Sequence, residues 1–550
     1  MPAGLEMLPT GLDAVPVSLA AQWTWGSDLA RLQAVVAAGL LLLALAWLPA
    51  LVRLAWIALR GLGPLERRAV AISLGLGVGL RLAVDDRLVM IFSAWRMAED
   101  VAAATGIPKY GAGTFVLHRL AFALAPPDHA VLVSWHRACA ILALPLWLAV
   151  LARTRPLPGT VGWAAALLAT MPLLVRDAAT ESNLVPAALG LAATLLLLDA
   201  ALDRGRPARG FLVGATVVGA WTAMTRPELP VVVALLAVAW PYVRRARLPW
   251  PSALLAGLAW SLLVAPHLLH VALSAAEEAT TGALPPLGFA RIPAAVQAIP
   301  QFAPLQPLLV PVAVPVLAAL AGSRPNARLA GVLLAVALLW MGLTSVDLPA
   351  PSVPRLHAPP VLLVTLVAAA GAAWLVQRTP RKLLATCWLA ACLALAALPT
   401  VPHLFARSNE DDAEVFLRRA FAALPPVGAC LVYLGFQDPP VPHRTQRALP
   451  AYLLRPPHRD VTVYDLGTWA RRGHPICRNG TYWLQDHRCW AVDRYHRRDA
   501  GTRLLSGCQA IRQAHPWRPV LEERAPNRGD NAYGYWGNGQ HFDLGLWRLP

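Results

Sequence analysis

Charged residues that could carry out chemistry lie directly beside long apolar segments of this sequence. Asp85 and Asp86 follow one such segment, and Asp177 and Glu181 follow another. Carboxylates can act as general bases or hold a divalent metal ion. A charge at the edge of an apolar segment is costly unless it faces water, a cavity or a binding site. These four residues are therefore the first candidates for an active site.

Basic residues occupy similar positions later in the chain. Arg226 lies in a Thr-Arg-Pro-Glu string between two apolar segments, and Arg355 and His357 lie at the start of another segment. Arginine presents a planar fork of donors that suits phosphate or carboxylate groups. We therefore predict that these three residues bind an anionic group.

Membrane-spanning helices are the elements that must position these residues. A helix needs about 20 mostly apolar residues to cross a bilayer, and we identify about twelve candidates, some of them shorter. The segments are 34–56, 69–84, 130–151, 161–175, 184–202, 211–225, 229–243, 252–272, 304–321, 328–346, 360–377 and 383–400.

The connections between these segments alternate between arginine-rich and arginine-poor. Cytoplasmic connections of membrane proteins carry an excess of Lys and Arg, so the arginine-rich set is predicted to be cytoplasmic. Its basic residues are Arg60, Arg67, Arg68, Arg153, Arg155, Arg204, Arg206, Arg209, Arg244, Arg245, Arg247, Arg324, Arg328, Arg378, Arg381 and Lys382. The other set is predicted to face outward, and it comprises the loop 85–129, the connections 273–303 and 347–359, the short turns 176–183 and 226–228, and the terminal regions 1–33 and 401–550.

The composition agrees with a membrane protein. The 550 residues are 57% hydrophobic and 14% charged, whereas soluble domains carry about 25% charge. The net charge of +17 could attract nucleic acid, but no Walker A motif, zinc-finger pattern or basic amphipathic helix accompanies it. The sequence thus excludes a purely soluble enzyme, and we expect no nucleic-acid partner.

The order of these features resembles the GT-C superfamily of polytopic glycosyltransferases, which includes protein O-mannosyltransferases and aminoarabinose lipid A transferases. The positions that carry the resemblance are Arg81, Asp85 and Asp86, Tyr110, Arg137, Asp177 or Glu181, Arg226 and Arg355. The chain departs from the family in its segment 34–56, which looks like an added anchor, and in its Asp-Asp pair, where many relatives have Asp-Glu or Thr-Glu.

The resemblance implies a multispanning α-helical glycosyltransferase in the cell inner membrane that takes sugar from a polyprenyl-phosphate donor. Asp85 or Asp86 would be the base, or would hold a divalent metal such as Mg or Mn, and Asp177 or Glu181 would orient the acceptor or complete that metal site. The predicted anion-binding residues would then hold the donor phosphate. The acceptor would be a glycan, a lipid or a protein.

The same resemblance makes Tyr110 and Arg137 candidates for binding substrate. For Arg137 the alternative is a partner inside the protein, either a buried acid or a backbone carbonyl. Asp199 and Asp203, near a predicted cytoplasmic end, are interpreted as boundary charges.

Other interpretations remain open for the site and for the whole chain. Paired aspartates beyond a helix can be a solvated boundary, and boundary arginines can reach lipid headgroups. A transporter or flippase of lipid-linked sugars would usually show paired inverted repeats, and we detect no second copy of the pattern from Asp85 to Arg137. A non-catalytic assembly protein is the third alternative.

The region 401–550 is long enough for a domain of its own. Residues 411–423 are predicted to form a helix and residues 429–434 and 461–464 to form strands, which indicates an α+β extracytoplasmic domain.

The region 401–550 contains Cys430, Cys477, Cys489 and Cys508. An even number of cysteines in an oxidising compartment favours disulfides, and three pairings are open. The alternative is a metal site formed by His474, Cys477, His487 and Cys489, although this spacing is not a standard zinc pattern.

Overall fold

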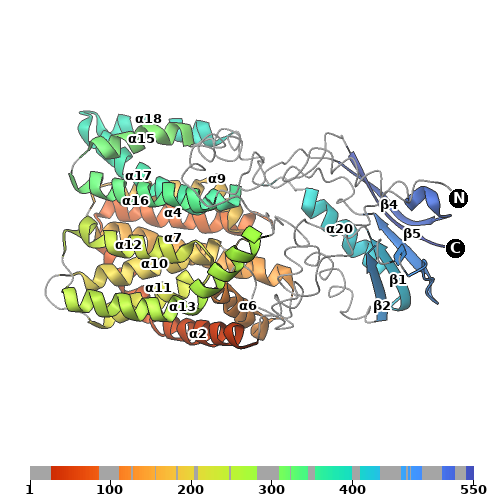
Figure 1. Ribbon diagram of the computed structural model, residues 1–550. Helices are drawn as coiled ribbons and strands as arrows, with labels where there is room; N and C mark the ends of the chain where they lie inside the picture. The colour runs from red at the N-terminus through yellow and green to blue at the C-terminus, as the bar shows by residue number, and fades with distance from the viewer. Residues whose placement is uncertain are drawn as a thin grey trace.

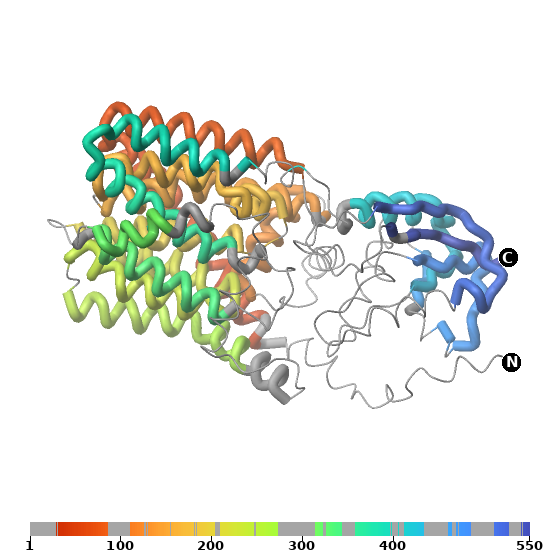
Figure 2. The backbone as a smooth tube through the Cα atoms, turned by 90° about the horizontal axis from the view of Figure 1, so that it is seen from above, coloured from red at the N-terminus to blue at the C-terminus, as the bar shows by residue number. Residues whose placement is uncertain are grey.

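The computed structural model describes part of the chain, and it separates a helical bundle from a C-terminal sheet (Figures 1 and 2). The described residues are 27–85, 111–125, 128–154, 156–180, 182, 184–203, 209–246, 249–280, 309–322, 324–344, 354–398, 405, 409–433, 460–465, 469–470, 472–485, 511–526 and 541–550.

Every predicted apolar segment coincides with one helix or with two consecutive helices. The helices of the bundle are α2 (Ser27–Ala46), α3 (Leu48–Arg60), α4 (Pro64–Ala83), α6 (Ala112–Leu124), α7 (His129–Arg153), α8 (Thr160–Thr170), α9 (Pro172–Asp177), α10 (Leu184–Ala201), α11 (Arg209–Ala223), α12 (Leu229–Arg244), α13 (Trp250–Thr280), α15 (Leu309–Ala321), α16 (Arg324–Thr344), α17 (Pro354–Arg378) and α18 (Lys382–Ala397).

Two segments that were predicted to be single helices are broken. The segment 34–56 comprises α2 and α3, which bend by 45° at Trp47. The segment 161–175 comprises α8 and α9, which are separated at Met171. A proline follows each break within two residues, and proline is favoured in the first turn of a new helix because it has no N–H to donate.

Five of the described helices are long and apolar enough to cross a membrane, and the bent pair α2–α3 would make a sixth. Shorter apolar helices lie at Ala112–Leu124, Thr160–Thr170, Leu229–Arg244 and Lys382–Leu395. The chain is therefore a helical membrane protein, while the total of twelve spans stays a prediction.

One end of the bundle gathers residues from the connections predicted to be cytoplasmic. Asp199 is fully buried, and its carboxylate lies 2.6 Å from Arg153 Nε and 2.7 Å from Arg244 Nε. Asp203 contacts the same two arginines from a half-exposed position. Asp199 is therefore a buried ion-pair residue, because Arg153 of α7 and Arg244 of α12 enclose its side chain as counter-ions, and its position at a membrane boundary stays a prediction.

The C-terminal part contains α20 (Asn409–Ala422) and the strands β1 (Val427–Tyr433), β2 (Asp460–Asp465), β3 (Thr481–Gln485), β4 (Arg518–Pro526) and β5 (His541–Arg548). The strand order is β2-β1-β3-β5-β4, with β1 parallel to both neighbours and β5 antiparallel to both of its neighbours. The predicted helix and the two predicted strands coincide with α20, β1 and β2.

The two faces of this sheet have different cores. Phe416 and Phe421 of α20 pack with Leu431 on one face, whereas Trp483 and Trp547 pack together on the other. This division follows from the strand geometry, because successive side chains of a strand point to opposite faces.

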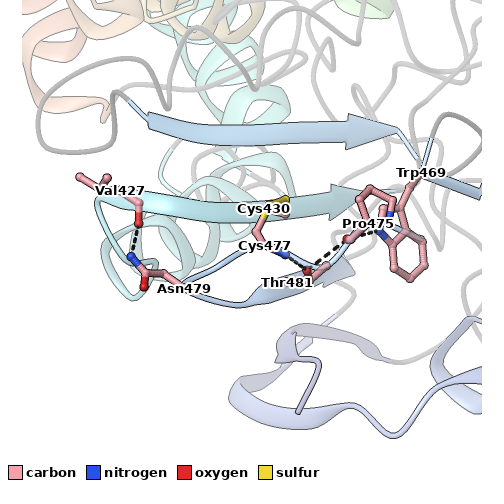
Figure 3. Close-up of a disulfide and its surroundings, with 7 residues drawn as sticks. All are labelled: Val427, Cys430, Trp469, Pro475, Cys477, Asn479 and Thr481. Carbon is pink, nitrogen blue, oxygen red and sulfur yellow. Dashed lines mark hydrogen bonds between the residues drawn. A yellow bond between two sulfur atoms is a disulfide. The ribbon is translucent and has the colours of Figure 1, made fainter. Parts of the chain in front are cut away.

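A disulfide joins β1 to the segment before β3 (Figure 3). It pairs Cys430 with Cys477, whose Cα atoms lie 5.5 Å apart. Cys489 and Cys508 lie outside the described residues. The alternative metal site is wrong as predicted, because the Cys477 sulfur is bonded to Cys430 and cannot serve as a thiolate ligand.

Candidate functional site

Four of the predicted site residues have described side chains. Asp85 is exposed just beyond α4, and Asp177 is the buried last residue of α9. Arg137 lies in α7, and Arg226 lies between α11 and α12.

The structure describes the remaining predicted residues only in part. Asp86, Tyr110 and Glu181 lie outside the described residues. Arg355 and His357 lie in the first turn of α17, and only their backbone is described.

Helix α7 connects the two acidic segments. Arg137 Nη2 donates to the carbonyl of Val84, at 2.9 Å, beside Asp85. On the preceding residue, His136 Nδ1 lies 3.1 Å from the carbonyl of Thr180, beyond Asp177. Consecutive helical residues point about 100° apart, so adjacent side chains can reach different neighbours. The structure thus gives Arg137 the backbone-carbonyl partner that was the alternative to a substrate contact.

Helix α6 connects these segments to the Arg226 segment. The amide of Gly113 donates to the carbonyl of Met224 at 2.9 Å, and Thr114 Oγ1 donates to the carbonyl of Thr225 at 2.9 Å. One turn of helix after Thr114, His118 Nε2 lies 2.8 Å from His136 Nε2 of α7. Helices α6 and α7 therefore bring the Asp85, Asp177 and Arg226 segments together.

Gly111, which follows Tyr110, fits this arrangement because it has no side chain. Its φ is +115°, and a Cβ at this position would lie 2.3 Å from the Met224 carbonyl oxygen. Only glycine adopts such a backbone readily. Gly111 is therefore held closely against the junction of α11 and α12.

Arg226 carries its own counter-ion. Its Nε lies 2.6 Å from Glu228 Oε1, and both side chains are largely buried. His267 Nε2 of α13 lies 3.3 Å from the Arg226 carbonyl, and the ring of His270 is nearby. The charge of Arg226 is thus partly neutralised within the protein by Glu228.

A cavity of about 50 Å³ lies between α4, α7, α8, α9, α10 and α17. Arg81 and Asp177 are its charged lining residues, and its walls are mainly apolar. Ala358 and Pro359 line it from α17, one turn after Arg355. The cavity therefore lies between α4, which precedes Asp85, the segment that contains Asp177, and the start of α17, which contains Arg355.

Arg81 is nearly fully buried, and its guanidinium donates to backbone carbonyls. Nη1 donates to Gly77 O at 3.0 Å and to Ala169 O at 3.3 Å, and Nη2 donates to Leu168 O at 3.0 Å. Two of these carbonyls end α8, where the break at Met171 leaves them without helical donors. Arg81 thus stabilises the broken helix and adds a positive charge to the cavity.

The sequence interpretation missed His118, His136, His267 and His270 as parts of this region. All four are buried. A usable signal was present, because an ionisable residue inside an apolar helix is costly and indicates function by default.

No group of three or more His, Cys, Asp or Glu side chains in the described part of the chain is arranged to hold a metal ion. Of the predicted metal ligands, Asp85 is described and Asp86 is not. The metal site stays a prediction.

Comparisons with known proteins yield matches among solved structures only. No protein-family model and no curated protein matches the sequence. The crystal structure of ArnT from Cupriavidus metallidurans bound to undecaprenyl phosphate aligns with a TM-score of 0.48 and 13% identity, covering 87% of this chain and 97% of that one. The cryo-EM structure of the arabinofuranosyltransferase AftD from Mycobacteria aligns with a TM-score of 0.45 and 15% identity, covering 88% of this chain and 40% of that one.

With both TM-scores below 0.5, neither likeness assigns a role to a residue of this chain. The chain resembles the GT-C superfamily in the order of its motifs, and its own contacts bring three of those motifs together.

Proposed function

We propose that this protein is a membrane glycosyltransferase that transfers sugar from a polyprenyl-phosphate donor at the outer face of the inner membrane. The observation that carries the proposal is the convergence of the Asp85, Asp177 and Arg226 segments through α6 and α7, beside a cavity lined by Arg81. Acidic and basic groups at one end of an apolar bundle suit a substrate that combines lipid, phosphate and sugar.

The chemistry divides between a base and a set of cations. Asp85 or Asp86 takes the proton of the acceptor hydroxyl or amine as that group attacks the sugar carbon. The bond from this carbon to the phosphate oxygen breaks, and the polyprenyl phosphate leaves with additional negative charge. Arg226, Arg355 and His357 stabilise that charge, while Asp177 or Glu181 orients the acceptor.

A divalent ion at Asp85 and Asp86 is a further part of the proposal. Carboxylate oxygens suit Mg²⁺ and Mn²⁺, and the exposed position of Asp85 leaves room for water ligands. A bound ion would supply positive charge to the leaving phosphate.

The orientation in the membrane is supported by the two ends of the bundle. Arg153 and Arg244, which belong to two of the basic connections, enclose Asp199 at one end, and we assign this end to the cytoplasm. The C-terminal part is assigned to the periplasm, where an oxidising environment suits the Cys430–Cys477 disulfide. Arg418 of α20 lies 3.9 Å from Asp128 at the start of α7, on the same side.

The proposal is tested by incubating the purified protein in lipid vesicles with a panel of polyprenyl-phosphate sugars and with candidate glycan, lipid and protein acceptors. Release of free polyprenyl phosphate, measured by mass spectrometry, is the expected result, because it reports transfer whatever the acceptor is. Movement of intact donor across sealed vesicles without any release would instead support a transporter.

A further inference from the structure

Two fully buried histidines lie between the segments of the proposed site. His118 of α6 and His136 of α7 have no solvent-exposed surface, and their Nε2 atoms lie 2.8 Å apart. Neither residue has a role in the chemistry described above.

The hydrogen bonds determine which ring nitrogens carry protons. A carbonyl can only accept, so His136 Nδ1 donates to the carbonyl of Thr180. When His136 is neutral, its Nε2 must then accept, and the donor is the Nε2–H of His118. The result is a directional chain of donors that runs from His118 through His136 to Thr180.

Thr180 is also bonded to the acidic segment. Its Oγ1 donates to the backbone carbonyl of Asp177 at 2.8 Å and lies 3.4 Å from the carboxylate. The amide of Ser182 donates to the same hydroxyl at 3.3 Å. The chain of hydrogen bonds therefore ends on Asp177, Thr180 and Ser182, between α9 and the start of α10, and Glu181 is adjacent to Thr180 in the sequence.

The other end of this chain of hydrogen bonds is His118, whose helix α6 also contacts the Arg226 segment. His118 and Thr114 belong to the same helix, and Thr114 Oγ1 donates to the carbonyl of Thr225. The imidazole pair is thus the polar link between the helix that holds the Arg226 segment and the turn that holds Asp177.

We propose that His118 and His136 are positioning residues, which hold the turn from Asp177 to Ser182 in the geometry that transfer requires. This inference rests on the proposed function. Apolar side chains could fill the same space, but buried hydrogen bonds fix one arrangement, and leaving one partner unsatisfied costs the desolvation of that group. The pair acts through Thr180 and touches no substrate.

Two isosteric variants of His136 separate hydrogen bonding from packing. In His136→Asn the side-chain amide takes the place of Nδ1 and can still donate to Thr180. In His136→Gln the amide takes the place of Nε2, which keeps the contact with His118 but loses the donor to Thr180. Gln fills the cavity better than Asn, so a pure packing role predicts the opposite order of activities.

The readout is the release of polyprenyl phosphate from whichever donor the wild type accepts. We expect His136→Asn to keep kcat within about threefold and His136→Gln to lose about tenfold or more in kcat with little change in KM, because positioning acts on the chemical step. Equal losses in the two variants, or higher activity in His136→Gln, would overturn the inference.

Hydrogen–deuterium exchange gives a measurement that is independent of turnover. The amides of residues 180–185 should exchange faster in His136→Gln than in His136→Asn, because the turn has lost its donor. Equal exchange rates in the two variants would overturn the inference even if the wild type uses none of the sugar donors. Faster exchange in His136→Gln, together with no turnover by the wild type, would contradict the proposed function alone. If the His136 variants do not fold, His118→Gln and His118→Leu give the same comparison, since only Gln keeps a donor at Nε2.

Discussion

Replacing Asp199 with asparagine should destabilise the helical bundle far more than replacing its neighbour Asp203. Asp199 is fully buried and contacts both Arg153 and Arg244, and it also accepts a hydrogen bond from Trp240 Nε1 at 3.3 Å. Asparagine keeps the shape of the side chain but removes the negative charge, which leaves two arginines with one remaining carboxylate.

The expected loss of folding free energy depends on how exposed each ion pair is. Removing one partner of a buried ion pair costs about 3 to 5 kcal/mol, because the other charge stays desolvated. The arginine side chains are 12% and 13% exposed and keep Asp203, so we expect the low end, about 3 kcal/mol for Asp199→Asn. The Asp203 side chain is 53% exposed, and an exposed pair contributes about 0 to 1 kcal/mol.

The assay is thermal unfolding of the purified protein in detergent. Unfolding is measured as the loss of the monodisperse peak on size-exclusion chromatography after heating. Asp199→Asn should lower the melting temperature by on the order of 5 to 10 °C, and Asp203→Asn by about 2 °C or less. Equal shifts for the two variants would refute the reasoning, because the argument depends on the difference in burial. A double variant, Arg153→Met with Asp199→Leu, should be more stable than Asp199→Asn alone, since it removes the uncompensated charge.

Three further predictions concern other parts of the chain. Gly111→Ala should abolish release of polyprenyl phosphate, because its new Cβ would collide with the Met224 carbonyl at 2.3 Å; normal activity would show that the turn is not fixed there. Cys430→Ser should lower the stability of the C-terminal part by about 4 kcal/mol, since the disulfide to Cys477 spans 47 residues; an unchanged denaturant midpoint would contradict this. Burial and a neighbouring histidine lower the pKa of His515, so its contribution to stability is present above about pH 6.5 and is lost as the pH falls; His515→Gln should flatten the pH dependence of unfolding, and an unaltered profile would count against it.

The sequence located the helices of the twelve apolar segments, because apolar length is a strong signal, but it did not identify α6, which lies within the predicted loop 85–129. It was less informative about breaks inside them. The break at Met171 coincides with a proline that was visible in the sequence, but a proline can also lie within a continuous helix, as Pro145 does in α7. Only packing decides between these outcomes, and here Arg81 satisfies the carbonyls that the break exposes.

The candidate site was partly predictable. Acidic and basic motifs at segment ends indicated which residues belong to one end of the bundle, and the backbone-carbonyl alternative for Arg137 is confirmed by its bond to Val84. The histidine pair was not predicted, because His118 and His136 are 18 residues apart and only the packing of α6 on α7 brings them together. The network around Asp199 depends in the same way on contacts between helices that are distant in sequence.

The central claim is that carboxylates beyond α4 activate the acceptor, and the release of polyprenyl phosphate by aspartate variants tests it most directly. The set comprises Asp85→Asn, Asp86→Asn, the double variant and Asp203→Asn, which lies at the opposite end of the bundle as a matched control. We predict that the double variant inserts into membranes and folds but releases no polyprenyl phosphate, while Asp203→Asn keeps wild-type activity. Full activity in both single variants and in the double variant would contradict the account.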